Sequence, residues 1–368
     1  MSESLQQLIA REIERAGGWL SFSRYMELAL YAPGLGYYMA GARRLGPDGD
    51  FVTAPEISRL FGRTLARQVR QLAEFGLSEI LEIGAGSGAL AADLLLELEQ
   101  ASCLPERYLI LELSPDLRDR SRDTLAARAP HLLERVAWLN QLPPAFNGTV
   151  IGNEVLDAMP AHVFERGDNG VVELGVTLRD GTFAWAARAT PEAAQADPGC
   201  FPQASYRTEI QLVARAFTRS LARAMVRGAV LFIDYGFPRH EYYHPQRSSG
   251  TLMCHYRHRA HGDPFFLPGL QDITAHVDFS AIADAGEQAG LAVLGYCNQA
   301  QFLINCGITE LLAQTPAEDV AAYAPRAAEA QKLLSPAEMG ELFKVLAMGK
   351  GVPDTLLGFA QGDRRHSL

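Results

Sequence analysis

Hydrophobic positions near the N-terminus of the chain recur at helical spacing. Leu5, Ile9 and Ile13 lie four residues apart, as on the apolar face of an amphipathic helix that Gly17-Gly18 would end. Further helices are expected over 21–30, before Pro33-Gly34, and over 57–75. The Gly- and Tyr-rich stretch between these two helices has no regular period, and such stretches are typical of a functional lid or binding loop.

After residue 76 the pattern changes to short apolar runs that alternate with helical segments. The runs predict strands at 79–83, 108–113, 135–139, 149–152 and 228–234, and the segments between them predict helices at 89–100, 115–128 and 205–226. Short apolar strands separated by helices indicate βαβ units around a buried parallel sheet. We therefore expect a doubly wound α/β fold.

The remaining segments predict additions to this core. Residues 163–188 alternate in polarity around Arg179-Asp180-Gly181, which predicts a β-hairpin outside the main sheet. Towards the C-terminus we expect a helix at 279–289, a closing strand pair at 291–296 and 301–305, helices over 307–350 and frayed last residues. The expected organisation is a helical and lid region at 1–75, a core at 76–305 with an insertion at about 163–204, and a helical extension at 306–368.

Composition narrows the class of protein. The chain has 368 residues, 48% of them hydrophobic, and a net charge of -10, so a sizeable core is available and a basic nucleic-acid-binding face is not expected. Its five cysteines form no CxxC pair, which favours a reducing compartment over a disulfide framework. No apolar run has the roughly 20 residues that span a bilayer, and no export signal is visible. We expect a cytoplasmic protein.

The segment Glu82-Ile83-Gly84-Ala85-Gly86-Ser87-Gly88 joins the first predicted strand to its helix. Glycines directly after a strand allow a tight turn and bring the backbone close to a ligand. The N-terminus of the following helix directs unpaired N–H groups towards an anionic group. Open α/β sheets bind ligands at this edge, although a glycine-rich turn without a ligand is the alternative.

The glycines alone do not choose the ligand, because Gly84, Gly86 and Ala89 also satisfy the dinucleotide pattern GxGxxA. Glu112 ends the second strand, where a carboxylate can bind both ribose hydroxyls, but it lies 28 positions after Gly84 and not the roughly 20 of a dinucleotide site. The carboxylate of Glu82 suits a cationic ligand better than a pyrophosphate. The GxGxxA pattern supports an NAD-dependent oxidoreductase as the alternative function.

Several motifs together resemble one family. EIGAGSG with its strand-end acid resembles class I S-adenosylmethionine-dependent methyltransferases, and SFSRYMELALYAPGLGYY, GDFVTAPEISRLFG, GNEVLDAMP and GLQDITAHVDF are similar to the MidA family. The resemblance covers roughly residues 5–305 in order. Mitochondrial members of that family are protein-arginine methyltransferases needed for assembly of respiratory complex I. The resemblance implies a seven-stranded, Rossmann-like methyltransferase sheet and S-adenosyl-L-methionine as cofactor.

The resemblance and the strand-end positions together predict the cofactor site. We expect the cofactor to contact Thr53, Glu56, Ser58, Glu82, Gly84, Ala85, Gly86, Gly88, Glu112, Leu113 and Asn153. The resemblance places TAPEIS over the methionine part of the cofactor, although Thr53 and Ser58 are also ordinary helix-start residues. Tyr37 and Tyr38 could face a sulfonium or pack the lid, and packing is favoured.

An arginine acceptor is protonated at pH 7, so carboxylates must hold it and disperse its charge. Glu154 and Asp157 follow the fourth strand and are predicted to contact the acceptor, with helix capping as the alternative for Asp157. His276 resembles a family position at the site, or else is a core histidine. Asp234 ends the fifth strand and is expected to border the acceptor channel rather than act as a catalytic acid.

Other chemistries are weaker alternatives. His255, His258 and His261 are three residues apart, but flanking glycines argue against a zinc-binding helix, and we expect a basic loop and no metal. The sequence has no GxxxxGK[ST], HExxH or GxSxG motif. A scaffold or assembly factor on a methyltransferase fold would use the insertion and the C-terminal helices for docking. A protein substrate, such as a respiratory complex subunit, is the expected partner, and the sequence predicts no particular oligomeric state.

Overall fold

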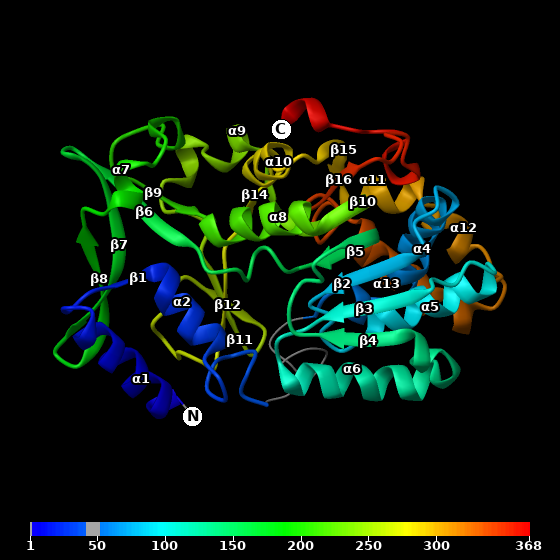
Figure 1. The fold of residues 1–368 in the computed structure, drawn as a ribbon, viewed down its shortest axis with the longest axis horizontal. Coiled ribbons are helices and arrows are strands. Elements are labelled where there is room, and N and C mark those ends of the chain that lie inside the picture. Colours follow the sequence, from blue (N-terminus) through cyan, green and yellow to red (C-terminus); the bar gives the residue numbers. More distant parts are fainter. Residues whose placement is uncertain (1, 42–51) are drawn as a thin grey trace. The chain divides into compact units, whose positions relative to one another are not determined.

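The computed structural model describes residues 2–41 and 52–368, which form two compact units. The first unit combines residues 2–41, 156–217 and 237–278, and the second combines 52–155, 218–236 and 279–368. Each unit is thus assembled from separate stretches of the chain, which Figure 1 shows by colour. Residues 42–51, part of the predicted lid loop, lie outside the described residues.

Seven strands of an eight-stranded sheet, in the order β15-β16-β10-β5-β2-β3-β4, organise the second unit (Figure 1). The strands β2 (Glu79–Ile83), β3 (Arg107–Leu111), β4 (Val136–Leu139), β5 (Phe146–Asn153) and β10 (Met225–Phe237) are parallel to one another, as their short apolar runs predict. The strand β16 (Phe343–Lys350) lies antiparallel between β10 and β15 (Ala292–Asn298). The predicted, mostly parallel α/β sheet is therefore confirmed.

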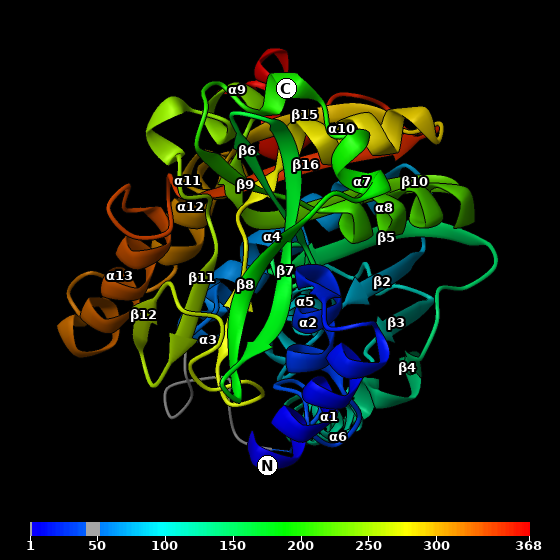
Figure 2. The same ribbon diagram turned by 90° about the vertical axis from the view of Figure 1, so that its left-hand side faces the viewer.

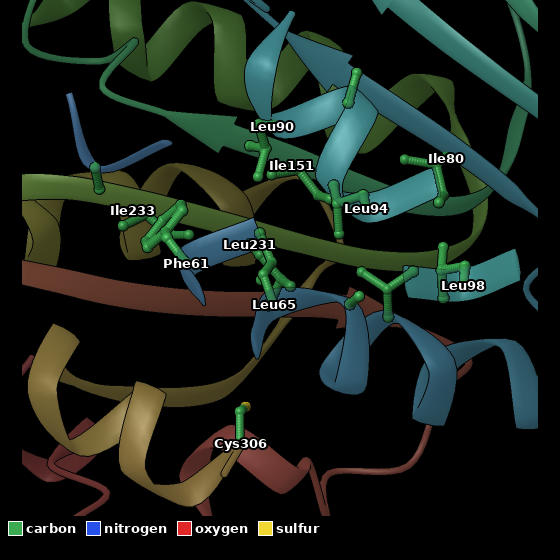
Figure 3. Packing of buried hydrophobic residues seen from close by; sticks show 14 of the residues in the cluster. Phe61, Leu65, Ile80, Leu90, Leu94, Leu98, Ile151, Leu231, Ile233 and Cys306 are labelled. Atoms are coloured by element: carbon green, nitrogen blue, oxygen red, sulfur yellow. The ribbon is translucent and has the colours of Figure 1, made fainter. Parts of the chain in front are cut away.

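The helices of this unit are α3 (Ala54–Ile57), α4 (Arg59–Glu74), α5 (Ala89–Gln100), α6 (Pro115–Arg128), α10 (Phe279–Gln288), α11 (Gln299–Asn305), α12 (Ile308–Leu312) and α13 (Val320–Leu334). Figure 3 shows how α4 and α5 pack on the sheet. Leu90, Leu94 and Leu98 recur every fourth residue, so they lie on one face of α5. They belong to the same buried cluster as Phe61 and Leu65 of α4. That face is buried against apolar side chains of the strands, which fixes the helix that follows the glycine loop.

The first unit contains a five-stranded antiparallel sheet, whose strands β7 and β8 are seen in front in Figure 2. Its path is β1 (Leu20–Ser21), β7 (Gly170–Arg179), β6 (His162–Gly167) and β9 (Tyr206–Ile210), with β8 (Thr182–Arg188) paired to β7. The predicted hairpin is confirmed, because Asp180 and Gly181 join β7 to β8 with positive φ angles of 50° and 78°. It is part of a larger sheet than predicted.

The helices α1 (Ser2–Arg15) and α2 (Phe22–Tyr31) supply much of the first unit's core. Leu5, Ile9 and Ile13 of α1 are buried there, as their spacing predicts. The remaining elements are α7 (Pro191–Ala194), α9 (Arg239–Tyr242), β11 (Met253–Tyr256), β12 (Arg259–His261), β13 (Asp272–Thr274) and β14 (Val277–Asp278). The helix α8 (Leu212–Ala224) begins in the first unit and ends in the second.

Three predictions of secondary structure were wrong. The segment 301–305 belongs to α11, because Asn298 caps that helix by accepting a hydrogen bond from the Gln301 N–H at 2.9 Å. The strand that pairs with β15 is β16, which we predicted as helix, since a strand buried on both faces has no alternating pattern. The predicted helix at 205–226 begins as the strand β9.

The last residues are also ordered, contrary to prediction. The Arg364 N–H donates to the Tyr296 carbonyl at 2.6 Å, and the Asp363 carboxylate accepts from the Tyr296 N–H at 3.1 Å. These bonds hold the C-terminal segment beside β15.

Among the described residues, no helix combines the length and the apolar character that a bilayer crossing requires.

Candidate functional site

The glycine loop between β2 and α5 has a backbone that other residues rarely adopt. Gly84, Gly86 and Gly88 have φ angles of 65°, 53° and 80°. A Cβ atom on Gly84 would lie 2.9 Å from Cγ1 of Val155, and one on Gly88 would lie 2.8 Å from Cα of Ser121. The loop therefore requires glycine for both its conformation and its packing, and Gly88 forms the N-cap of α5.

The carboxyl group of Glu82 is buried directly before this loop. Burial is the main reason that its pKa is raised to about 7. The Tyr108 hydroxyl, which donates to Oε2 at 2.7 Å, acts to lower this pKa, and the nearby carboxylate of Glu112 acts to raise it. Tyr108 lies on the neighbouring strand β3. Glu82 therefore binds and releases a proton near neutral pH, and a cation bound beside it would favour the ionised form.

Glu112 follows the last residue of β3 and is buried. Burial raises its pKa, whereas hydrogen bonds from the backbone N–H groups of Ser114, Leu113 and Gly86 lower it. The Ser114 bond to Oε1 measures 2.9 Å. The contact with Gly86 connects Glu112 to the glycine loop, and the next side chain, Leu113, is 58% exposed, so it can cover a bound ring.

The end of β5 carries Asn153 and Glu154. The Asn153 Nδ2 donates to Glu154 Oε1 at 3.1 Å, and the buried Asn153 Oδ1 has no hydrogen-bond partner among the described residues. Glu154 has a φ of 53°, a left-handed conformation that is rare for residues other than glycine. Because β5 pairs with β2, both residues lie at the end of a strand next to the one that carries the glycine loop.

Asp157 and His276, the other two predicted catalytic residues, lie close together in the first unit. The N–H of Ala275 donates to the Asp157 carbonyl at 3.0 Å, and the His276 ring stacks on Phe237 with centroids 5.4 Å apart. The helix-capping alternative for Asp157 is wrong, because β6 and not a helix follows it. Whether the two side chains contact the acceptor stays a prediction.

The TAPEIS segment forms α3 and the start of α4. Ser58 caps α4 by accepting from the Leu60 N–H at 3.2 Å, and its hydroxyl donates to Glu329 Oε2 of α13 at 2.7 Å. Thr53 is the N-cap residue of α3, but its side chain makes no capping bond. Glu56 and Ser58 line a pocket of about 690 Å³ whose wall includes residues of α5 and α13. The structural role predicted as the alternative for Ser58 is confirmed, and cofactor contacts of all three stay predictions.

The tyrosines at 37 and 38 pack inside the first unit. Tyr37 is 1% exposed, and the Tyr38 ring stacks on Tyr31 with centroids 5.5 Å apart. The Tyr38 hydroxyl also donates to Asp272 Oδ1 at 2.9 Å. The packing interpretation of these aromatic residues is confirmed.

The histidine-rich segment forms a β-hairpin from β11 and β12, not a helix. His255 and His261 lie on the two strands and His258 in the turn between them, with a φ of 59°. Within residues 2–41 and 52–368, no three His, Cys, Asp or Glu side chains are grouped so that they could hold a metal ion.

Sequence reasoning missed two contributors to this site, Tyr108 and Val155, and the structural role of a third, Asp234. Tyr108 could have been found, because alternation places it on the same face of β3 as residue 110 and next to the strand of Glu82. Val155 carries no local signal. Asp234 accepts the Val155 N–H at 3.1 Å through Oδ2, a contact that depends on the pairing of β5 with β10.

These residues fit S-adenosyl-L-methionine. The buried Asn153 Oδ1 and the Glu82 carboxyl can accept hydrogen bonds from its ammonium group, and Glu112 can accept from the two ribose hydroxyls. The glycine loop leads into α5 through Gly88, and the backbone N–H groups at the N-terminus of α5 can donate to the cofactor's carboxylate.

Comparisons with known proteins agree with this fit. Residues 60–297 match the model of a family of S-adenosyl-L-methionine-dependent methyltransferases. The "Protein arginine methyltransferase NDUFAF7, mitochondrial" of Mus musculus is 30% identical over 91% of this chain and 82% of its own length, and the Danio rerio protein is 28% identical over 90% and 84%.

Solved structures agree as well. A Burkholderia thailandensis protein crystallised with S-adenosyl-homocysteine is 52% identical, with a TM-score of 0.97 over 100% of this chain and 97% of its own. A native crystal structure of a protein from the same organism has 51% identity and a TM-score of 0.94, again over 100% and 97% of the two chains. The chain therefore belongs to the S-adenosyl-L-methionine-dependent methyltransferases, in the family of the NDUFAF7 and MidA proteins, and S-adenosyl-L-methionine is its cofactor.

Proposed function

We propose that the methyl acceptor is an arginine side chain of a protein partner. The observation that carries the proposal is the Glu154 carboxylate, held by Asn153 at the end of β5, beside the strand of the glycine loop. A guanidinium is a planar cation whose N–H groups match a carboxylate. Support also comes from the names of the relatives, which are protein arginine methyltransferases at 28–30% identity.

The cofactor supplies a sulfonium methyl group, which is transferred by in-line displacement. A bond forms between the methyl carbon and a guanidinium nitrogen, the carbon–sulfur bond breaks, and S-adenosyl-homocysteine leaves. The reacting nitrogen loses one proton, which the Glu154 carboxylate can accept and pass to water. Glu154 orients the nitrogen and neutralises the guanidinium charge, and such positioning can contribute several kcal/mol.

We extend the proposal to the partner and the compartment. The MidA-family motifs in the sequence favour a respiratory-complex subunit as the methylated protein, and the five cysteines without a CxxC pair favour the cytoplasm. Co-purification of methylated respiratory subunits with the tagged protein, from a cytoplasmic fraction, is the expected observation.

The acceptor is tested with tritiated S-adenosyl-L-methionine and two matched peptide libraries, one with a central arginine and one with a central lysine, each with randomised neighbours. We expect label in the arginine library alone, recovered as methylarginine after hydrolysis. Label in the lysine library, or in neither library, would contradict an arginine acceptor, whereas binding of the cofactor would remain intact in both cases.

Proton release is a further expected result. In the absence of cofactor the pKa of Glu82 in the folded protein is raised to about 7. Protonated Glu82 therefore stabilises the fold fully when the pH is below the pKa that Glu82 has in the unfolded chain, and this stabilisation is lost as the pH rises through about 7. The cationic cofactor favours the ionised form. S-adenosyl-L-methionine should therefore bind about tenfold more tightly at pH 8 than at pH 6, with proton release near pH 7.

Calorimetry in buffers of different ionisation enthalpy measures this release. Glu82→Gln should bind the cofactor without releasing a proton, whereas the surface control Glu134→Gln should behave as the unmodified protein. An unchanged proton release in Glu82→Gln would assign the titrating group elsewhere.

A further inference from the structure

We infer that Asp234 is a positioning residue for methyl transfer, which holds the turn that presents Glu154 to the acceptor. The inference rests on the proposed function of Glu154. Asp234 lies near the end of β10, and its side chain is completely buried. Its Oδ2 accepts the N–H of Val155 at 3.1 Å, and its Oδ1 accepts the N–H of Tyr235 at 2.9 Å. One carboxylate thus connects the ends of two neighbouring strands.

The turn after β5 needs such support. Asn153 is paired in register with Ile233 of β10, and the Glu154 N–H donates to the Ile233 carbonyl at 2.8 Å. Glu154 is left-handed, with a φ of 53°, and this conformation costs about 1 kcal/mol or more unless the surroundings hold it. The Ile233 carbonyl and the Asp234 carboxylate bind the two successive N–H groups of Glu154 and Val155, and so fix the backbone that carries the Glu154 side chain.

Val155 connects this turn to the cofactor loop. Its Cγ1 lies 2.9 Å from the position of a Cβ on Gly84, and its Cγ2 lies 2.9 Å from that of a Cβ on Gly152. The isopropyl group therefore fills the space between the glycine loop and the end of β5. By holding the Val155 backbone, Asp234 also sets the distance between the acceptor side of the site and the cofactor side.

The arrangement requires a carboxylate. Both oxygens of Asp234 accept backbone N–H groups, and the amide of asparagine offers only one acceptor, so its NH₂ group would face an N–H donor. Asp234→Asn has nearly the same shape and therefore tests the hydrogen bonds with little change in packing. We expect the turn to loosen while the sheet remains folded.

A double-mutant cycle with the arginine-centred library and tritiated cofactor tests the inference. Asp234→Asn alone should lower kcat by about 10- to 100-fold, whereas in a Glu154→Gln background it should lower the remaining rate by no more than about 3-fold. The Kd for S-adenosyl-homocysteine should stay within about 3-fold in all variants. Asp354→Asn, at an exposed position, is the matched control.

Hydrogen exchange of the Val155 amide supplies a measurement that needs no acceptor. We expect faster exchange of this amide in Asp234→Asn, with unchanged protection of the core strand β2. Equal losses of kcat in both backgrounds, or unchanged exchange at Val155, would overturn the positioning role. Normal transfer by Glu154→Gln alone would instead contradict the proposed function, so the two failures are separable.

Discussion

Glu154→Gln is expected to lower kcat for arginine methylation by about 100- to 1000-fold, because the amide has no charge to neutralise the guanidinium and is a far weaker base for its proton. The substitution keeps the shape of the side chain, and its amide oxygen can still accept the Asn153 Nδ2 at 3.1 Å. The turn and the cofactor loop should therefore keep their structure. The loss arises in the transfer step, where positioning and charge dispersal act on the acceptor.

Single-turnover transfer from tritiated cofactor to the arginine-centred library measures this loss, and calorimetry with S-adenosyl-homocysteine measures the binding of cofactor separately. We expect the Kd of the variant to stay within about 3-fold of the original, since S-adenosyl-homocysteine includes no acceptor group. Glu134→Gln, an exposed carboxylate in the same unit, is the control. A rate for Glu154→Gln close to that of the control would remove Glu154 from the acceptor site.

Glu112→Ala should weaken binding of S-adenosyl-homocysteine by about 100- to 1000-fold. Each hydrogen bond to a charged group contributes about 1.5–3 kcal/mol, and the substitution removes the carboxylate that we expect to bind both ribose hydroxyls. It also removes the acceptor that joins the backbone N–H groups of Gly86 and Ser114. The substitution therefore breaks the connection between the glycine loop and the end of β3 and also removes the contacts that we expect with the ribose.

Calorimetry measures the change in Kd, and thermal unfolding shows whether the fold is kept. Glu112→Gln separates the two contributions: it retains an acceptor for one N–H group, so we expect binding intermediate between Glu112→Ala and the original protein. Glu106→Ala, exposed just before β3, is the matched control. Binding of the cofactor by Glu112→Ala within about 3-fold of that control would contradict the assignment of Glu112 to the ribose.

Local patterns predicted the core of the sheet and the strand-end positions of several candidate site residues. Two local signals identify these elements: the apolar runs of β2 and β3, and the leucines that recur every fourth residue on α5. Because both signals depend only on residues close in the chain, the glycine loop, Glu82 and Glu112 could be assigned to strand ends from the sequence. Local patterns failed for β16, since its short apolar run Val345-Leu346-Ala347-Met348 is buried and does not alternate with polar residues, so it is compatible with a helix or a strand until its partners are known.

The motif after β5 shows the limit of such patterns. Sequence alone placed Asn153 and Glu154 at the carboxyl edge of the sheet, because both follow a predicted strand and precede a proline. The geometry of this motif depends on β10, which lies more than seventy residues further along the chain. Pairing with β10 determines the left-handed backbone of Glu154, the position of Val155 against Gly84, and the hydrogen bond from Val155 to Asp234.

The chemical groups of the site were thus readable from the chain, since residue type and strand position determine which groups reach the edge of a parallel sheet. Their geometry was decided only when β5 paired with β2 and β10, because strand pairing and burial, not local propensity, bring Tyr108 to Glu82 and Asp234 to Val155.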